Sequence, residues 1–286
     1  MSETTHDLAG RTFLITGSNT GIGAVTASAI GKRGGKVFLA CRSEDKTRPV
    51  VDAIRSAGGT AEFLALDLAD LGSVRSCAET FLARSEPLHV LINNAGLAGK
   101  QGLTRDGFEL TFGTNHLGHF LLTQLLLPRL RTSTPARIVN VASIAHYKCK
   151  GIDFDALKKP GTTVTGMHEY EVSKLCNVLF TKELARGRAG EGVHSYALHP
   201  GVVASDVWRQ VPWPVRSIMK LFMLSNEDGA KTTIHCATSP AVAADNGLYY
   251  DKCAAKAPSP LSEDAALAKK LWEASEEFVS LKRAAA

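Results

Sequence analysis

Short apolar runs alternate with longer amphipathic segments along most of the chain. The runs that read as strands are residues 12–16, 36–41, 61–66, 88–92, 137–142, 193–198 and 247–250. The segments that read as helices are residues 24–32, 45–56, 73–82, 108–130, 169–188, 228–238 and 263–281. Each strand run is apolar at successive positions, so both of its faces should be buried, as in a parallel sheet that helices cover.

This alternation predicts the topology of an α/β fold. Parallel strands joined by helices require right-handed crossovers, which give a doubly wound sheet with helices on both faces. Seven runs predict a seven-stranded parallel sheet. Because no low-complexity linker or internal repeat interrupts the pattern, we expect one domain over residues 1–286. Its cofactor half should span residues 10–142, and its catalytic and substrate half residues 143–286.

Composition narrows the class of protein. Hydrophobic residues make up 44% of the 286 residues, enough for a sizeable core, and the net charge of +5 is carried by scattered lysines and arginines. No dense basic run is present, so no nucleic-acid partner is expected. The polar N-terminus lacks the apolar segment of a secretion signal, and no apolar stretch is long enough for a membrane span. With six cysteines and no C-x-x-C pair, we expect reduced thiols and a cytoplasmic protein.

A glycine-rich turn follows the first strand and opens the first helix. Its glycines, Gly17, Gly21 and Gly23, have the spacing G-x-x-x-G-x-G. Glycines allow a positive φ and let backbone N–H groups approach a pyrophosphate, while the helix N-terminus adds positive potential. The turn therefore predicts a dinucleotide site in a Rossmann-type fold. The expected binding residues are Gly17, Ser18, Asn19, Thr20, Gly21, Ile22 and Gly23.

The end of the second strand indicates which dinucleotide binds. An NAD site places an acidic residue here to bind the ribose 2′-hydroxyl. This chain has Cys41 at that position, followed by Arg42, whose guanidinium suits a 2′-phosphate. We therefore expect NADP(H) to be preferred. Because Ser18, Asn19 and Thr20 add no positive charge, NAD(H) stays open as an alternative.

Polar and small residues also follow the third and fourth strands. Asp67 and Leu68 come after the third strand, where ligands of open α/β sheets bind, and Asp67 is expected near the adenine. A carboxylate that only caps the loop is the alternative. Asn94, Ala95 and Gly96 follow the fourth strand, where an amide and small residues can contact backbone and cofactor together.

These pieces occur in an order that resembles the short-chain dehydrogenase/reductase family. The matching residues are Thr16–Gly23, Asp67, Asn93–Gly96, Asn115, Ser143, Tyr170, Lys174, Pro200 and Gly201. Further stretches, such as Ala40–Arg42, Thr114–Phe120 and His199–Val203, are similar to retinol dehydrogenase-like members. The chain departs from that branch in lacking an N-terminal hydrophobic anchor, in having Ser205 for threonine, and in having Cys176 for a small residue.

Four residues carry the expected chemistry. Tyr170 and Lys174 are four positions apart on a predicted helix, so they share one face, and a nearby cation favours the phenolate of a tyrosine. Tyr170 is expected to exchange a proton with the substrate oxygen, which Ser143 would hold. The resemblance implies that Lys174 binds the nicotinamide ribose and that Asn115 forms a helix kink holding a water. A capping or solvent-facing amide is the alternative for Asn115.

Two segments are expected near the substrate. The resemblance implies that Pro200, Gly201, Val203 and Ser205 lie at the nicotinamide carboxamide. Residues 144–169, with Tyr147, Phe154 and Met167, are expected to flank the pocket. The apolar residues among 208–224 suggest a lid or peripheral membrane contact, with simple packing on the core as the alternative.

The sequence thus predicts an NADP(H)-dependent oxidoreductase that interconverts a carbonyl compound and an alcohol. An apolar substrate is expected, retinal-like, steroid-like or aromatic, and reduction is the expected direction. The alternatives are a non-catalytic NADP-binding sensor or scaffold and, less favoured by the glycine spacing, an epimerase or dehydratase. No metal is expected, because metal-ligand spacing is absent from the histidines considered, which are His116, His119, His146, His168 and His199. The resemblance implies a homodimer or homotetramer through the helices at 108–130 and 169–188, although monomeric relatives exist.

Overall fold

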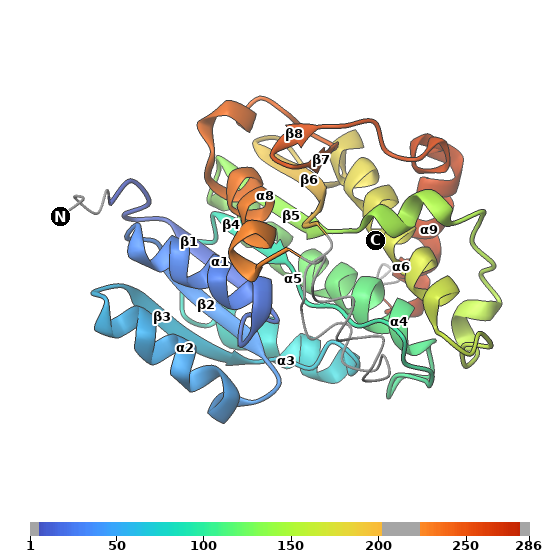
Figure 1. Cartoon of the computed structure of the whole chain (residues 1–286), viewed down its shortest axis with the longest axis horizontal. Coiled ribbons are helices and arrows are strands. Elements are labelled where there is room, and N and C mark those ends of the chain that lie inside the picture. The colour runs from blue at the N-terminus through green and yellow to red at the C-terminus, as the bar shows by residue number, and fades with distance from the viewer. Residues whose placement is uncertain (1–5, 202–223, 281–286) are drawn as a thin grey trace, which may run out of the picture.

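The computed structural model describes residues 6–201 and 224–280, which form a sheet of eight strands between two layers of helices (Figure 1). The strand order is β3-β2-β1-β4-β5-β6-β7-β8. The strands are β1 Thr12–Thr16, β2 Lys36–Cys41, β3 Thr60–Ala65, β4 Val90–Asn93, β5 Ala136–Val141, β6 Val193–His199, β7 Leu248–Asp251 and β8 Ala254–Ala255. This confirms the doubly wound α/β fold.

Seven of these strands are parallel, as predicted, and β8 is the addition. It pairs antiparallel with β7 through Tyr250 with Ala255 and Asp251 with Ala254. The connecting residues Lys252 and Cys253 have positive φ values of 52° and 61°, which close a tight hairpin. A strand of two residues has no hydrophobic period, so the sequence pattern could not indicate it.

Helices cover both faces of the sheet. One face carries α1 Gly21–Lys32, α2 Glu44–Ser56 and α8 Asn226–Thr238. The other carries α3 Leu71–Leu82, α5 Gly118–Thr132 and α6 Met167–Glu183, and α9 Ala265–Phe278 packs on α6. Short helical turns are α4 Leu110–Phe112, η1 Gly113–Leu117, η2 Ile144–Lys148, η3 Ala156–Lys158, η4 Leu184–Arg188, η6 Pro240–Val242 and η7 Pro260–Glu263. The two largest buried clusters of the described residues lie one on each face of the sheet.

The segment predicted as one helix over residues 108–130 is divided. It contains α4, then a π-helical turn, η1, and then α5. α5 continues through Pro128 to Thr132, two residues beyond the predicted end at Leu130. Leu126, Leu127 and Leu130 are buried on both sides of the proline, and this packing holds the last turn. The helix predicted over residues 169–188 likewise ends in a π turn, η4, around Gly187.

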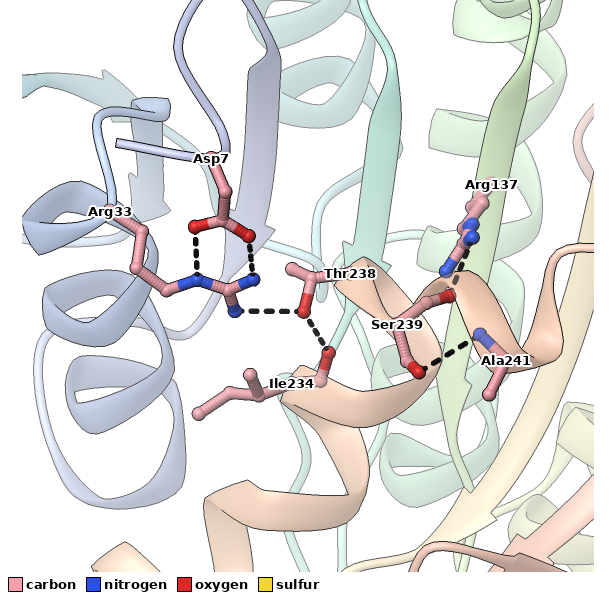
Figure 2. Close-up of polar contacts among 7 residues, drawn as sticks. All are labelled: Asp7, Arg33, Arg137, Ile234, Thr238, Ser239 and Ala241. Atoms are coloured by element: carbon pink, nitrogen blue, oxygen red, sulfur yellow. Dashed lines mark hydrogen bonds and ion pairs between the residues drawn. The ribbon is translucent and has the colours of Figure 1, made fainter. Parts of the chain in front are cut away.

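Two arginines anchor α8 at the edge of the sheet opposite the strand ends that carry the motifs (Figure 2). Arg33 binds the Asp7 carboxylate and donates to Thr238 Oγ1 at 2.9 Å. Arg137, buried at the start of β5, donates to the carbonyls of Cys236 at 3.0 Å and Ser239 at 2.8 Å. The free carbonyls at a helix C-terminus favour a cation, so Arg137 is a stabilising cap. It fixes the helix that follows residues 202–223.

Because β1 to β7 are parallel, the residues at their carboxyl ends share one edge of the sheet. The strand order reverses between β1 and β4, and such a reversal leaves a crevice in doubly wound folds. Thr16 of β1 and Asn93 of β4 end beside this crevice. The motifs found in the sequence therefore meet there.

Candidate active site

The glycine-rich turn has the conformation that its sequence predicts. Gly17 and Gly21 have φ values of +63° and +58°. A Cβ on Gly17 would lie 2.8 Å from the Cβ of Ala95, so a side chain at this position has no room. Helix α1 begins at Gly21, earlier than the predicted Ala24, and its first turn carries no acidic residue. Its N-terminus therefore presents positive potential to the crevice without a carboxylate to repel an anion.

The loop after β2 carries Cys41 and Arg42 at the edge of the crevice. The Cys41 thiol is buried and accepts a hydrogen bond from the Ser18 backbone N–H at 3.2 Å. Arg42, next to it, is exposed and lines the crevice. Cys41 thus supports the glycine turn from below, while Arg42 is available to a phosphate.

Asp67 caps its loop and also lines the cavity, while its contact with the adenine stays a prediction. Its carboxylate accepts from the Ala69 backbone N–H at 3.0 Å, so it caps the loop. Asp67 and Leu68 also line the cavity. The capping bond uses Oδ1, which fixes the carboxylate in place at the edge of the cavity.

The loops after β1 and β4 are tied together at the reversal of the sheet. The Asn94 amide donates to the carbonyls of Thr16 at 2.8 Å and Gly17 at 3.2 Å. The backbone N–H groups of Asn94 and Ala95 both donate to Thr16 Oγ1 at 3.0 Å. Since its acceptor capacity is used, the Thr16 hydroxyl donates its proton to His119 Nε2, 2.8 Å away.

His119 extends this network to Asn115. With Nε2 accepting from Thr16, the ring carries its proton on Nδ1 and donates to the Asn115 carbonyl at 2.9 Å. Burial lowers the pKa of His119 to about 4, which keeps this neutral form. No role other than metal binding was weighed for His119 from the sequence. Its position four residues after Asn115 was the signal that the two share a helix face.

Asn115 is buried inside the π turn η1, where the Gly118 N–H bonds to the Gly113 carbonyl. Its side chain accepts from Leu97 N and donates to Leu97 O, both at 2.9 Å. It also donates to Ser173 Oγ at 3.0 Å. The expected irregularity is therefore present as a π turn, and a solvent-facing amide is excluded. The water implied by the family resemblance stays a prediction.

Ser143, Tyr170 and Lys174 meet at the end of β5. Lys174 Nζ donates to the Val141 carbonyl at 2.8 Å and lies 5.5 Å from the centre of the Tyr170 ring. Burial raises the pKa of Tyr170, and a hydrogen bond with Ser143 offsets this in part. Burial lowers the pKa of Lys174 to about 7. Burial thus favours a neutral phenol on Tyr170, whereas the sequence predicted that a nearby cation favours the phenolate.

The loop before α6 is held by Glu169, which was not among the predicted site residues. The Glu169 carboxylate accepts from the backbone N–H groups of Thr162 at 3.0 Å and Thr163 at 3.1 Å. Met167, the first residue of α6, lines the cavity as predicted. Phe154 instead packs on the core and Tyr147 bonds the carbonyl of Ala257, so neither is a lining residue.

One cavity of about 460 Å³ connects these groups. Its lining includes the predicted positions Gly17, Asn19, Thr20, Gly21, Ile22, Gly23, Arg42, Asp67, Leu68, Asn94, Ala95, Gly96, Ser143, Tyr170, Lys174, Pro200 and Gly201. Ser18 and Asn115 lie behind the lining and support it. Val203, Ser205 and the segment 208–223 are outside the described residues. The N-terminus of α1, the close glycine turn and the exposed Arg42 fit an anionic dinucleotide.

Comparisons with known proteins identify the family. The sequence profile described as short chain dehydrogenase matches residues 11–154. Retinol dehydrogenase 12 of Homo sapiens is 42% identical over 98% of this chain and 89% of its own length. The chain belongs to the short-chain dehydrogenase family. It is therefore an oxidoreductase of the kind that interconverts alcohols and carbonyl compounds with a nicotinamide cofactor, and it is retinol dehydrogenase-like.

Solved structures agree with this assignment. An uncharacterized protein from Mycobacterium Paratuberculosis has 34% sequence identity and a TM-score of 0.76, covering 96% of this chain and 94% of that one. A protein described as an NAD(P)-dependent gluconate 5-dehydrogenase from Beutenbergia cavernae was solved with bound NADP at low occupancy. It has 25% identity and a TM-score of 0.68, covering 86% of this family member and 96% of that chain.

Four further expectations concern a metal ion, a membrane span, an oligomer and the cellular location. Among the described residues, no group of three or more His, Cys, Asp or Glu side chains could hold a metal ion. None of the helices within residues 6–201 and 224–280 is long and apolar enough to span a membrane. α5 and α6 lie in the segments through which an oligomer was predicted. Trp272 of α9 packs against Phe120 of α5 and Phe180 of α6. The predicted homo-oligomer and cytoplasmic location stay predictions.

Proposed function

We propose that this short-chain dehydrogenase is an NADP(H)-dependent reductase of apolar aldehydes or ketones. The observation that carries the proposal is the continuous cavity, which runs from Arg42 past the glycine turn to Ser143, Tyr170 and Lys174. Beyond these residues its lining includes the apolar side chains Leu97, Ala98, Leu110, Ala145 and Met167. A retinal-like, steroid-like or aromatic carbonyl compound suits such a wall.

The preference for NADP(H) is supported by charge. Arg42 lines the cavity next to Cys41, the position at which an NAD enzyme would carry a carboxylate, and the Cys41 thiol accepts a hydrogen bond from the Ser18 backbone N–H. A guanidinium forms paired hydrogen bonds with a phosphate, which a 2′-hydroxyl cannot match. The related structure with bound NADP is consistent with this choice.

The side chains supply a proton and hold the reacting oxygen. Ser143 and Tyr170 are both positioned to donate to a carbonyl oxygen, and the raised pKa of Tyr170 keeps its proton available for reduction. Lys174, with a lowered pKa, is the nearby group that can return a proton to the phenol. When bound, the nicotinamide supplies the hydride.

The test is a screen of NADPH oxidation, followed by absorbance, with retinal, alkyl aldehydes, aromatic ketones and steroid ketones. NADH is run in parallel with each substrate. We expect turnover of at least one apolar class with NADPH, at a kcat/KM well above that with NADH. Tight NADPH binding without turnover of any class would reject the reductase and favour the sensor. Faster turnover with NADH would reject the cofactor assignment.

A further inference from the structure

His146 lies three residues after Ser143, in η2, and its side chain is fully buried. Its Nδ1 is 2.6 Å from the Ser143 carbonyl oxygen. Its Nε2 is 3.1 Å from the backbone nitrogen of Ser259, a residue 113 positions further along the chain. The imidazole therefore bridges a predicted catalytic residue and a distant segment, and it is absent from the lining of the cavity.

The two partners of His146 determine where its proton lies. A backbone N–H can only donate, so Nε2 must accept the bond from Ser259 and carry no hydrogen. A backbone carbonyl can only accept, so Nδ1 must carry the hydrogen that bonds Ser143. The neutral Nδ1–H tautomer is the one form that satisfies both bonds. Burial lowers the pKa of His146, which keeps the ring neutral.

The segment bound by His146 is residues 257–262, which we call the C-terminal strap. Tyr147, the residue next to His146, donates its hydroxyl to the Ala257 carbonyl. Within the strap, the hydroxyls of Ser259 and Ser262 are 2.7 Å apart, and Ser262 N donates to Ser259 O at 2.9 Å. Two consecutive side chains of η2 thus hold an internally bonded strap.

Two aromatic side chains also pack against the His146 ring. Tyr249 of β7 packs against His146 with 4.7 Å between the ring centres, and Tyr147 does so at 4.1 Å. The ring can neither rotate nor move away without breaking these contacts. The hydrogen on Nδ1 therefore points constantly at the Ser143 peptide.

We propose that His146 is a positioning residue for Ser143. By donating to the Ser143 carbonyl it fixes the peptide at the start of η2, where the Ser143 hydroxyl accepts from Ala145 N at 3.2 Å and faces Tyr170. The C-terminal strap selects the Nδ1–H tautomer through the Ser259 N–H, and this hydrogen bond helps to hold the ring in place. The proposal rests on the reductase function above, in which Ser143 binds the substrate oxygen.

Two substitutions of His146 each keep one of its two hydrogen bonds and remove the other. In His146→Asn, the side-chain amide replaces Nδ1 and can still donate to Ser143, while the bond to Ser259 is lost. In His146→Gln, the longer side chain places an oxygen near Nε2 that can accept from Ser259, while the donor to Ser143 is lost. We expect kcat to fall by at least about tenfold in His146→Gln and to stay within about threefold in His146→Asn. Thermal stability should fall more in His146→Asn.

The dissociation constant for NADPH should be unchanged in both variants, because His146 does not line the cavity. In a Ser143→Ala background, His146→Gln should cause no further loss of kcat, since the residue acts through the Ser143 hydroxyl. An equal loss of kcat in the two variants would overturn the proposal. So would a full additional loss in the Ser143→Ala background, which indicates a general structural role.

A second measurement does not depend on turnover. Nitrogen-15 NMR of the histidine side chains, with the His146 signals assigned by their absence in His146→Asn, reports which ring nitrogen is protonated. At pH 7.5 we expect Nδ1 protonated and Nε2 bare. A proton on Nε2 would overturn the inference even if the enzyme were active. Absence of turnover together with an Nδ1–H tautomer would instead overturn the reductase function on which the role rests.

Discussion

The side-chain amine of Lys174 lies 5.5 Å from the centre of the Tyr170 ring, one turn away on α6, and both side chains are buried. Burial disfavours the charged form of each residue: it raises the pKa of Tyr170 and lowers that of Lys174 to about 7. The phenol therefore keeps its proton, and the amine can exchange one near neutral pH. This arrangement suits proton donation to a carbonyl oxygen.

Tyr170→Phe removes the proton donor and leaves the ring in place. Because general acid catalysis contributes about 10²–10⁴-fold, kcat should fall by that factor, while the dissociation constant for NADPH stays nearly unchanged. Steady-state kinetics and a fluorescence titration with NADPH measure the two quantities. A kcat equal to that of the wild type contradicts the assignment of Tyr170.

Lys174→Met should change how stability depends on pH. The folded pKa of about 7 lies below the ordinary value of 10.5, so the unfolded state binds one more proton above pH 7. The free energy of unfolding of the wild type should therefore rise with pH between 7 and 10.5, by up to about 1.4 kcal/mol per pH unit from this residue. Lys174→Met should lack that contribution.

The measurement for Lys174 is urea unfolding of both proteins between pH 7 and 9. The slope against pH is compared rather than the absolute stability, because the substitution also removes the hydrogen bond to Val141. Parallel slopes in the two proteins would show that Lys174 is not titrating in this window.

Arg42→Ala should weaken NADPH binding much more than NADH binding. A charge-assisted pair with the 2′-phosphate contributes about 1.5–3 kcal/mol, or roughly 10- to 100-fold in the dissociation constant. Arg48→Ala is the control, since Arg48 is an exposed arginine nearby on α2 that does not line the cavity. Calorimetry of both variants gives their dissociation constants for NADPH and for NADH, which are compared with those of the wild type. An equal effect of Arg42→Ala on NADPH and NADH binding rejects the phosphate contact.

Gly17→Ala should impair cofactor binding through two effects. A residue other than glycine at positive φ costs about 1 kcal/mol, and the new Cβ would also lie 2.8 Å from the Cβ of Ala95. Gly58→Ala is a matched control, because Gly58 has φ +83° and nothing within 4 Å of the added atom. We expect both variants to lose stability and Gly17→Ala alone to bind NADPH at least about tenfold more weakly. Equal NADPH affinities in the two variants would mean that the turn is not a cofactor site.

The sequence by itself determined the parallel strands, the glycine-rich turn at Gly17–Gly23 and the common helix of Tyr170 and Lys174. These features depend on local patterns: β1 at Thr12–Thr16 and β2 at Lys36–Cys41 were predicted with their observed bounds, because a short apolar run between a turn and a helix has few other conformations. The spacing of Tyr170 and Lys174 likewise fixes their shared face on any helix.

Only the tertiary structure decided the features that join distant parts of the chain. The π turn at Asn115 is held by Leu97, 18 positions away, and no local pattern encodes that bond. The tautomer of His146 follows from Ser259, whose backbone N–H carries no sequence signature. Burial, which lowers the pKa of Lys174 and raises that of Tyr170, exists only once α6 is packed against the sheet, because desolvation depends on the surrounding atoms and not on the residue itself.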